Sequence, residues 1–164
     1  MRSMLSVMLV SLLAAAAPLH AQTAARTAAP ASAGAQQRDA MARQDAQMST
    51  AAARVAQLID NGKAGEVWDG ASQAMRRSVA RSAFIDGVQD DRVKLGALTR
   101  RGQPSVTRVQ YAEGSAVPAG TYINVSFPSV FALRGQPVRE LVSFRLDEDQ
   151  TWRVSGYSVR PAGQ

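Results

Sequence analysis

The sequence predicts an α+β domain in which three helices precede a four-stranded antiparallel sheet. Two observations support this prediction. Apolar residues recur at helical spacing from about Ser49 to Gly96. After Gly96 they alternate with a period of two, which is typical of strands that bury one face. Because the helical segments come first and the strands follow as hairpins, we expect the helices to cover a single face of the sheet.

Three helices are expected, over residues 49–61, 64–75 and 82–95. Ser49 or Thr50 can cap the first helix, and Gly62 and Gly96 suit the left-handed positions that end the first and the third. The second helix is short. Its apolar stripe includes Trp68, which we therefore expect to face the core.

Four strands are expected, over residues 106–111, 122–133, 138–146 and 152–159. Pro128 predicts that the second strand lies at an edge or is bulged there. Gly156 predicts a bend or bulge in the last strand. Counting along an unbroken strand places Trp152 and Tyr157 on opposite faces, so only one of them is expected to line a given cavity.

The N-terminus reads as an export signal over residues 1–21. Arg2 precedes a mostly apolar run over residues 4–17, and cleavage is expected between Ala21 and Gln22. The run is shorter than the roughly 20 residues that span a bilayer, which disfavours an uncleaved anchor. We expect a periplasmic or secreted protein with a flexible Ala-rich linker over 22–47, one domain over 48–161 and a tail over 162–164.

Composition excludes several kinds of chemistry. The 164 residues include 19 Lys+Arg and 13 Asp+Glu, a formal net charge of +6, with no Cys and one His. That histidine, His20, lies inside the expected signal. The absence of cysteine excludes disulfides, thiolate metal sites and cysteine nucleophiles. We also expect no cofactor. The scattered arginines and few aromatics do not favour nucleic acid, whereas a basic exported chain can be attracted to anionic envelope components.

The segment over residues 140–159 carries a resemblance to a known family. Its Trp152-Arg153-Val154 followed by Gly156-Tyr157 resembles the last hairpin of the small exported bacterial proteins called domain of unknown function 4019. Trp68-Asp69, residues 92–96 and the strand over 122–131 are also similar to that family. The resemblance implies a cystatin-like or nuclear transport factor 2-like architecture, with a curved sheet wrapped on helices. It implies no activity and no catalytic residue.

Five residues are candidates for a ligand pocket: Trp68, Asp69, Arg92, Tyr122 and Tyr157. Asp69 beside a cavity would be a general base or a ligand anchor, although a solvated Asp69 next to a core Trp68 is the favoured interpretation. Arg92 would present a guanidinium to an anion, or cap the end of its own helix. The tyrosines would orient a ligand or simply pack.

The acidic run over residues 147–149 lacks the spaced oxygens of a calcium loop, and we interpret it as a solvated hairpin tip. Three functions stay open. The favoured one is non-catalytic binding of a small molecule, an envelope component or a partner protein. The second is an isomerase or dehydratase that uses Asp69 and a tyrosine. The third is a structural or inhibitory module that acts through a sheet edge.

Overall fold

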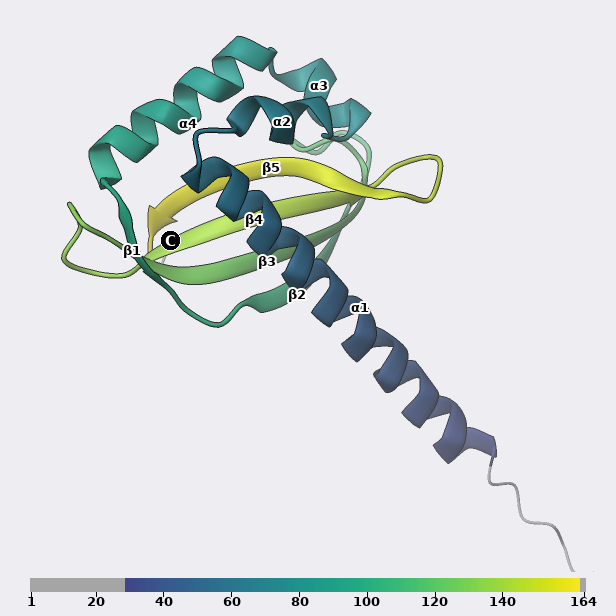
Figure 1. The fold of residues 1–164 in the computed structure, drawn as a ribbon. Coiled ribbons are helices and arrows are strands. Elements are labelled where there is room, and N and C mark those ends of the chain that lie inside the picture. Colours follow the sequence, from purple (N-terminus) through teal and green to yellow (C-terminus); the bar gives the residue numbers. More distant parts are fainter. Residues whose placement is uncertain (1–28, 163–164) are drawn as a thin grey trace, which may run out of the picture.

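The chain folds as helices followed by one antiparallel sheet, as a computed structural model shows for residues 29–162 (Figure 1). The elements are α1 (Ala29–Asp60), α2 (Ala64–Asp69), α3 (Gln73–Ser78), α4 (Arg81–Leu95), β1 (Leu98–Arg101), β2 (Ser105–Tyr111), β3 (Gly120–Phe131), β4 (Val138–Leu146) and β5 (Trp152–Pro161). The α+β class is confirmed. The described part has five strands and four helices rather than the four and three expected.

The sheet is open and is built around β3. One side of β3 pairs with β2 and then with the short β1, and the other side pairs with β4, which pairs in turn with β5. Pro128 therefore lies in a central strand, and the prediction of an edge strand is wrong. The proline is tolerated because the β1/β2 side is interrupted there. Gly102 donates its N–H to the Pro128 carbonyl (2.8 Å) in the gap between the two short strands.

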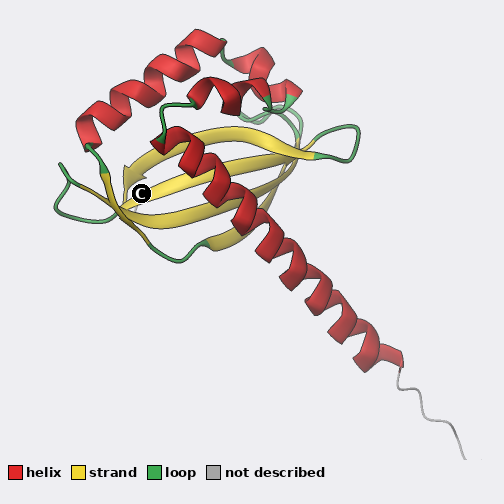
Figure 2. Cartoon of the chain, viewed as in Figure 1, coloured by secondary structure: helices red, strands yellow, loops and turns green. Residues whose placement is uncertain are grey.

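One face of the sheet is covered by the helices, and we call it the inner face (Figure 2). The alternation predicted for β3 is confirmed on this face, where five side chains are buried: Ile123, Val125, Phe127, Ser129 and Phe131. The register places Val142 opposite Val125 and Phe144 opposite Ile123. The inner face therefore forms the hydrophobic core with the buried sides of the helices.

The bulge predicted near Gly156 is confirmed in β5. Ser143 pairs with Gly156 and Phe144 pairs with Val154, so Ser155 is an extra residue without a partner in β4. The extra residue reverses the alternation. Tyr157 is opposite Val142 and Trp152 is opposite Leu146, so both aromatic rings belong to the inner face. The expectation that they point to opposite faces is wrong for this reason.

Helix α1 begins at Ala29, so residues 29–47 of the expected linker are helical. Alanine has the highest intrinsic helix propensity and needs no apolar face to favour the helix. Arg108 of β2 also contacts this part of the helix, because its Nη2 donates to Gln44 (2.8 Å) and to Asp45 (2.6 Å). The first turns project away from the sheet (Figure 1). The expected signal over residues 1–21 and the linker residues before 29 lie outside the described part.

The helix expected over 64–75 is two helices, because Ser72 starts a new one. The Ser72 hydroxyl accepts a hydrogen bond from the Met75 N–H (3.1 Å), which caps α3. The Ser72 N–H donates to the Val154 carbonyl of β5 (2.8 Å). The turn therefore attaches the helical layer to the sheet edge. Gly62 and Gly96 end α1 and α4 with positive φ angles of 72° and 76°, as predicted.

Candidate functional site

A carboxylate is completely buried beneath the helices. Glu140 of β4 occupies an inner-face position between Val138 and Val142, and 0% of it is exposed. Its Oε2 accepts hydrogen bonds from Ser129 Oγ (2.7 Å) and Arg101 Nε (2.7 Å). Its Oε1 accepts from Tyr157 Oη (2.8 Å) and Arg101 Nη2 (2.9 Å). A buried charge needs such partners, and here both oxygens have two.

The charges continue from Glu140 to the end of α1. Arg101 Nη2 also donates to Asp60 Oδ2 (2.9 Å), and Arg92 of α4 forms an ion pair with the same Asp60. We call the group the ion network: Asp60, Arg92, Arg101 and Glu140, with Ser129 and Tyr157. The guanidinium of Arg92 lies 4.8 Å from the centroid of the Phe131 ring, and this cation–π contact further stabilises the charge of Arg92. Two cations balance two anions, so the network is neutral overall.

The ion network suits a structural role better than proton transfer. Burial acts to raise the pKa of Glu140, but the hydrogen bonds from Arg101 and Ser129 outweigh it, and the pKa lies below its ordinary value. Burial, together with the Glu140 charge, raises the pKa of Tyr157 well above its ordinary value. Glu140 is therefore held ionised and Tyr157 protonated at neutral pH. Neither group is poised to exchange a proton.

Beside the network, a cleft of about 470 Å³ lies between the end of α1 and α4, with Asp60, Val88, Arg92 and Gly96 in its wall. Arg92 Nη1 is buried and has no hydrogen-bond partner among the described residues. The cleft presents little net charge to a ligand, because Asp60 and Arg92 in its wall neutralise each other.

A groove of about 500 Å³ lies on the outer face of the sheet, which the helices leave uncovered. Leu141, Ser143, Gly156 and Ser158 contribute to its wall, as does Tyr122. We call it the outer groove.

The two ends of the outer groove differ in chemistry. At one end Tyr111 and Tyr122 make an edge-to-face contact, with ring centroids 5.2 Å apart. The Tyr122 hydroxyl donates to the Pro118 carbonyl (2.7 Å), which holds its ring in place. At the other end Arg139 of β4 and Arg160 of β5 occupy directly opposite positions in the register. The groove thus joins an aromatic end to a basic end.

The five residues predicted for a pocket do not form one site. Arg92 and Tyr157 are joined through the ion network, and Tyr122 belongs to the outer groove. Trp68 packs against the core, and its Nε1–H donates to the Val79 carbonyl (3.0 Å). Asp69 is exposed and accepts two hydrogen bonds from Arg81, at 2.8 and 3.0 Å, which lower its pKa. That pairing makes Asp69 unsuitable as a base.

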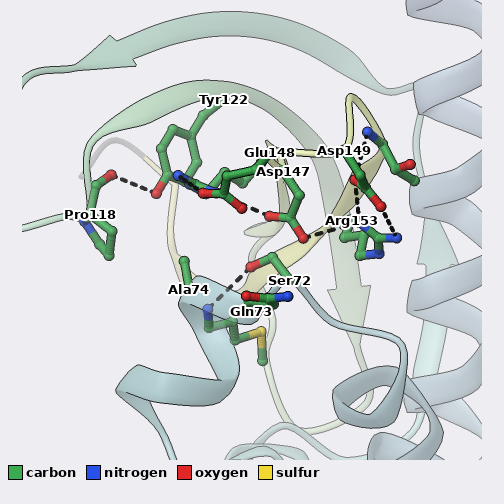
Figure 3. A network of polar contacts seen from close by, with 12 residues as sticks. Ser72, Gln73, Ala74, Pro118, Tyr122, Asp147, Glu148, Asp149 and Arg153 are labelled. Atoms are coloured by element: carbon green, nitrogen blue, oxygen red, sulfur yellow. Dashed lines mark hydrogen bonds and ion pairs between the residues drawn. The ribbon is translucent and has the colours of Figure 1, made fainter.

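The acidic hairpin is also tied to arginines (Figure 3). Asp147 is only 4% exposed, so the prediction of a solvated tip is wrong for this residue. Its oxygens accept from Arg145 (3.1 Å) and Arg153 (3.2 Å), and Arg153 also binds Asp149 (2.7 Å). These carboxylates are already paired with cations. In the described part of the chain, no group of three or more His, Cys, Asp or Glu side chains is placed to hold a metal ion.

Sequence reasoning missed Glu140 as a residue of interest, together with its partner Arg101 and with Asp60, which pairs with Arg101. One signal was available. In Val138-Arg139-Glu140-Leu141-Val142, the strict alternation places a charged residue at a position that must face the core. Such a residue has to find a cation and hydrogen-bond donors, but the sequence alone does not say where they come from.

Comparison with known proteins matches the chain to a family. A family model described as a protein of unknown function (DUF4019) matches residues 51–157. No curated protein matches the chain. No solved structure matches it either. The matched region runs from the packed half of α1 to Tyr157 of the ion network, which is well over half of the chain, and the chain therefore belongs to the DUF4019 family.

Proposed function

We propose that this protein is an exported, non-catalytic binding domain whose ligand occupies the outer groove. The observation that carries the proposal is the groove itself, because it is an open hollow of about 500 Å³ on the sheet face without helices. Export rests on the signal-like residues 1–21 and places the domain in the periplasm or outside the cell.

The chemistry of the groove favours a small anionic ligand with an apolar or aromatic part. Arg139 and Arg160 occupy directly opposite positions in neighbouring strands, which makes one end of the groove basic. A guanidinium group is a strong hydrogen-bond donor to a carboxylate, sulfate or phosphate, so this end of the groove favours an anionic group. Tyr111 offers a partly exposed ring at the other end, where the buried Tyr122 packs against it edge to face.

Binding is better supported than catalysis. The carboxylates that lie near a tyrosine or in a cleft are already paired with arginines, as Glu140 is with Arg101 and Asp60 with Arg92. Asp69 and the tyrosines of the isomerase alternative lie on different parts of the molecule, since Asp69 is paired with Arg81 on the helical side.

The proposal also extends to the architecture. A single antiparallel sheet with helices on one face is compatible with the cystatin-like or nuclear transport factor 2-like class.

The test uses the anionic aromatic probe 8-anilinonaphthalene-1-sulfonate and two tryptophan variants. Ser143→Trp places a large ring in the outer groove, whereas Gln57→Trp places the same ring on an exposed turn of α1. We expect fluorescence titration to show at least about tenfold weaker probe binding for Ser143→Trp and no change for Gln57→Trp. Equal binding by both variants, with unchanged stability, would reject the groove as the site.

A second measurement addresses export and the natural ligand. Protein purified from the native cell envelope should begin at or near Gln22, as N-terminal sequencing can establish. Mass spectrometry of small molecules released from the same preparation should identify an anionic compound. An intact Met1 on membrane-bound protein would contradict the export proposal.

A further inference from the structure

One end of the molecule gathers basic side chains from segments far apart in the sequence. Residues 92–102, 129–139 and 159–162 meet where α4 ends, β1 begins, β3 turns into β4 and β5 ends (Figure 1). We call these residues the basic end. They contain no Asp or Glu, and their cations are Arg92, Lys94, Arg100, Arg101, Arg134, Arg139 and Arg160. The ion network neutralises Arg92 and Arg101.

Four of the other five cations at this end keep an exposed charge. Lys94, Arg100, Arg134 and Arg160 are all exposed. Among the residues that the structure describes, no ion pair involves any of these four. The nearest acids along the chain are Asp91, which is exposed on the preceding turn of α4, and Glu140, which is buried in the ion network. The exposed charge at the basic end is therefore of one sign.

Two exposed apolar side chains lie among these cations. Val93 of α4 is 77% exposed and Leu133 of the β3–β4 loop is 66% exposed. Leu133 is fixed at the end of α4, because its N–H donates to the Leu95 carbonyl (2.9 Å) and its side chain lies against Gly96. Among the described residues, Met41 on α1 is the other exposed large apolar side chain. Single exposed apolar side chains are common on protein surfaces, and these two are of interest because they lie in the same segments as the exposed cations.

We propose that the basic end docks on the surface of an anionic lipid bilayer. Val93 and Leu133 enter the boundary between headgroups and acyl chains, and Lys94, Arg134 and Arg160 contact lipid phosphates. Cations close to an anionic leaflet are attracted to it, and apolar side chains that protrude beside them gain by entering the interface. The match of charge, together with apolar groups that protrude, favours a bilayer over a folded acidic protein. This inference rests on the export proposed above, but not on the outer groove.

The experiment is co-sedimentation of the protein, as isolated from its native envelope, with vesicles. Vesicles of phosphatidylglycerol and phosphatidylethanolamine are compared with vesicles of phosphatidylcholine alone. We expect binding to the anionic vesicles only. Each cation near the surface contributes about fivefold in affinity, so Lys94→Gln/Arg134→Gln/Arg160→Gln should weaken binding by about a hundredfold. The matched control, Arg38→Gln/Arg43→Gln/Arg54→Gln, removes the same charge from α1 and should bind nearly as well as the parent.

The apolar contribution is tested by Val93→Ser/Leu133→Ser, with Met41→Ser as its control. We expect the double variant to bind roughly tenfold more weakly or worse, and Met41→Ser to bind like the parent. Urea midpoints equal to that of the parent show that the variants are folded.

Three results would overturn the docking proposal. One is an equal loss of binding for the two triple variants, since net charge would then explain it. Another is no effect of Val93→Ser/Leu133→Ser, which would point to a soluble polyanion or an acidic protein. The third is the absence of vesicle binding. If the probe still binds the outer groove in that case, docking fails and the proposed ligand site stands.

Discussion

At the scale of single residues, Glu140 has the clearest consequence for stability. The fold lowers its pKa below the ordinary value of 4.5. A carboxyl whose pKa is lowered contributes stability that is present above its unfolded pKa and is lost as the pH falls through its folded pKa. The parent protein should therefore lose stability below about pH 4.5 partly through Glu140.

Replacing Glu140 with glutamine tests this. Glu140→Gln leaves the Arg101 charge without its buried partner, and we expect a loss of about 3 kcal/mol at pH 7. The difference from the parent should shrink as the pH falls, because the parent carboxylate then becomes protonated. Urea denaturation between pH 3 and pH 7 measures both effects. Glu113→Gln, in the exposed β2–β3 loop, should match the parent at pH 7. A constant difference between Glu140→Gln and the parent would contradict the argument.

Trp68 is the second residue with a measurable consequence. Its ring packs against the core and its indole N–H binds the Val79 carbonyl. Trp68→Ala should cost about 3 kcal/mol, because it empties a partly buried site. Trp68→Phe keeps most of the ring and should cost only about 1 kcal/mol for the lost hydrogen bond. If Trp68→Ala changed the free energy of unfolding by less than about 1 kcal/mol, a role in ligand contact would be the better explanation.

At the scale of elements, the sequence predicts strands well where one face is buried. The bounds of β4 agree with the prediction, and β3 differs by about two residues at either end. The alternation of apolar and polar residues is a property of one strand, and β3 and β4 keep it in the folded protein. The sequence did not reveal β1, since Leu98–Arg101 has only one apolar residue and pairs with β3 about thirty positions away.

Other features depend on contacts that no local pattern contains. The bulge at Ser155 reverses the faces of the residues after it, so counting by two along β5 gave the wrong face for Tyr157. The break between α2 and α3 depends on the bond from Ser72 to Val154 of β5. The members of the ion network come from six different elements, and only the position of Glu140 is suggested by its own strand.

The bulge gives the third prediction. A Cβ atom added at Gly156 would be 3.9 Å from Ser143 Cβ, which is ordinary contact. Gly156→Val should therefore change stability by no more than about 1 kcal/mol. Deleting Ser155 removes the extra residue and leaves a regular ladder, in which Val154, Gly156 and Tyr157 keep Phe144, Ser143 and Val142 as partners. Tyr157 then stays on the inner face beside Glu140, and we expect the deletion to cost no more than about 2 kcal/mol in urea unfolding. A loss above about 3 kcal/mol for the deletion would reject this account of the bulge.

Helix α1 gives the fourth prediction, because its two halves differ in packing. Ala40 lies in the exposed half, and Ala53 lies between the buried Ala52 and Val55. Ala53→Pro should cost about 3 kcal/mol or more, since proline breaks the packed half. Ala40→Pro should reduce the helical circular dichroism signal but change the free energy of unfolding by less than about 1 kcal/mol. Equal losses for both variants would mean that the projecting turns belong to the cooperative fold.

At the scale of the whole molecule, the two proposed surfaces, the outer groove and the basic end, are adjacent. The outer groove ends at Arg139 and Arg160, and both arginines also belong to the basic end. A bilayer contacted by the basic end would therefore lie next to the basic mouth of the groove. A ligand with an anionic group and an apolar part would then have a short path between the membrane and the domain.

The ion network has a further consequence, for the order in which the molecule assembles. Three of the four strand pairings join consecutive strands and close short loops. The bonds from Arg101 reach 39 residues to Glu140 and 41 residues to Asp60, and they also require the helices to be in place. We expect these bonds to form after the rate-limiting barrier, because closing long loops is costly until the hairpins exist. In stopped-flow kinetics Glu140→Gln should then speed unfolding by about a hundredfold while the folding rate stays close to that of the parent. The ion network would thus form late in folding and would set the unfolding rate, and with it the lifetime of the native state, rather than the folding rate. Slower folding of Glu140→Gln with an unchanged unfolding rate would show the opposite.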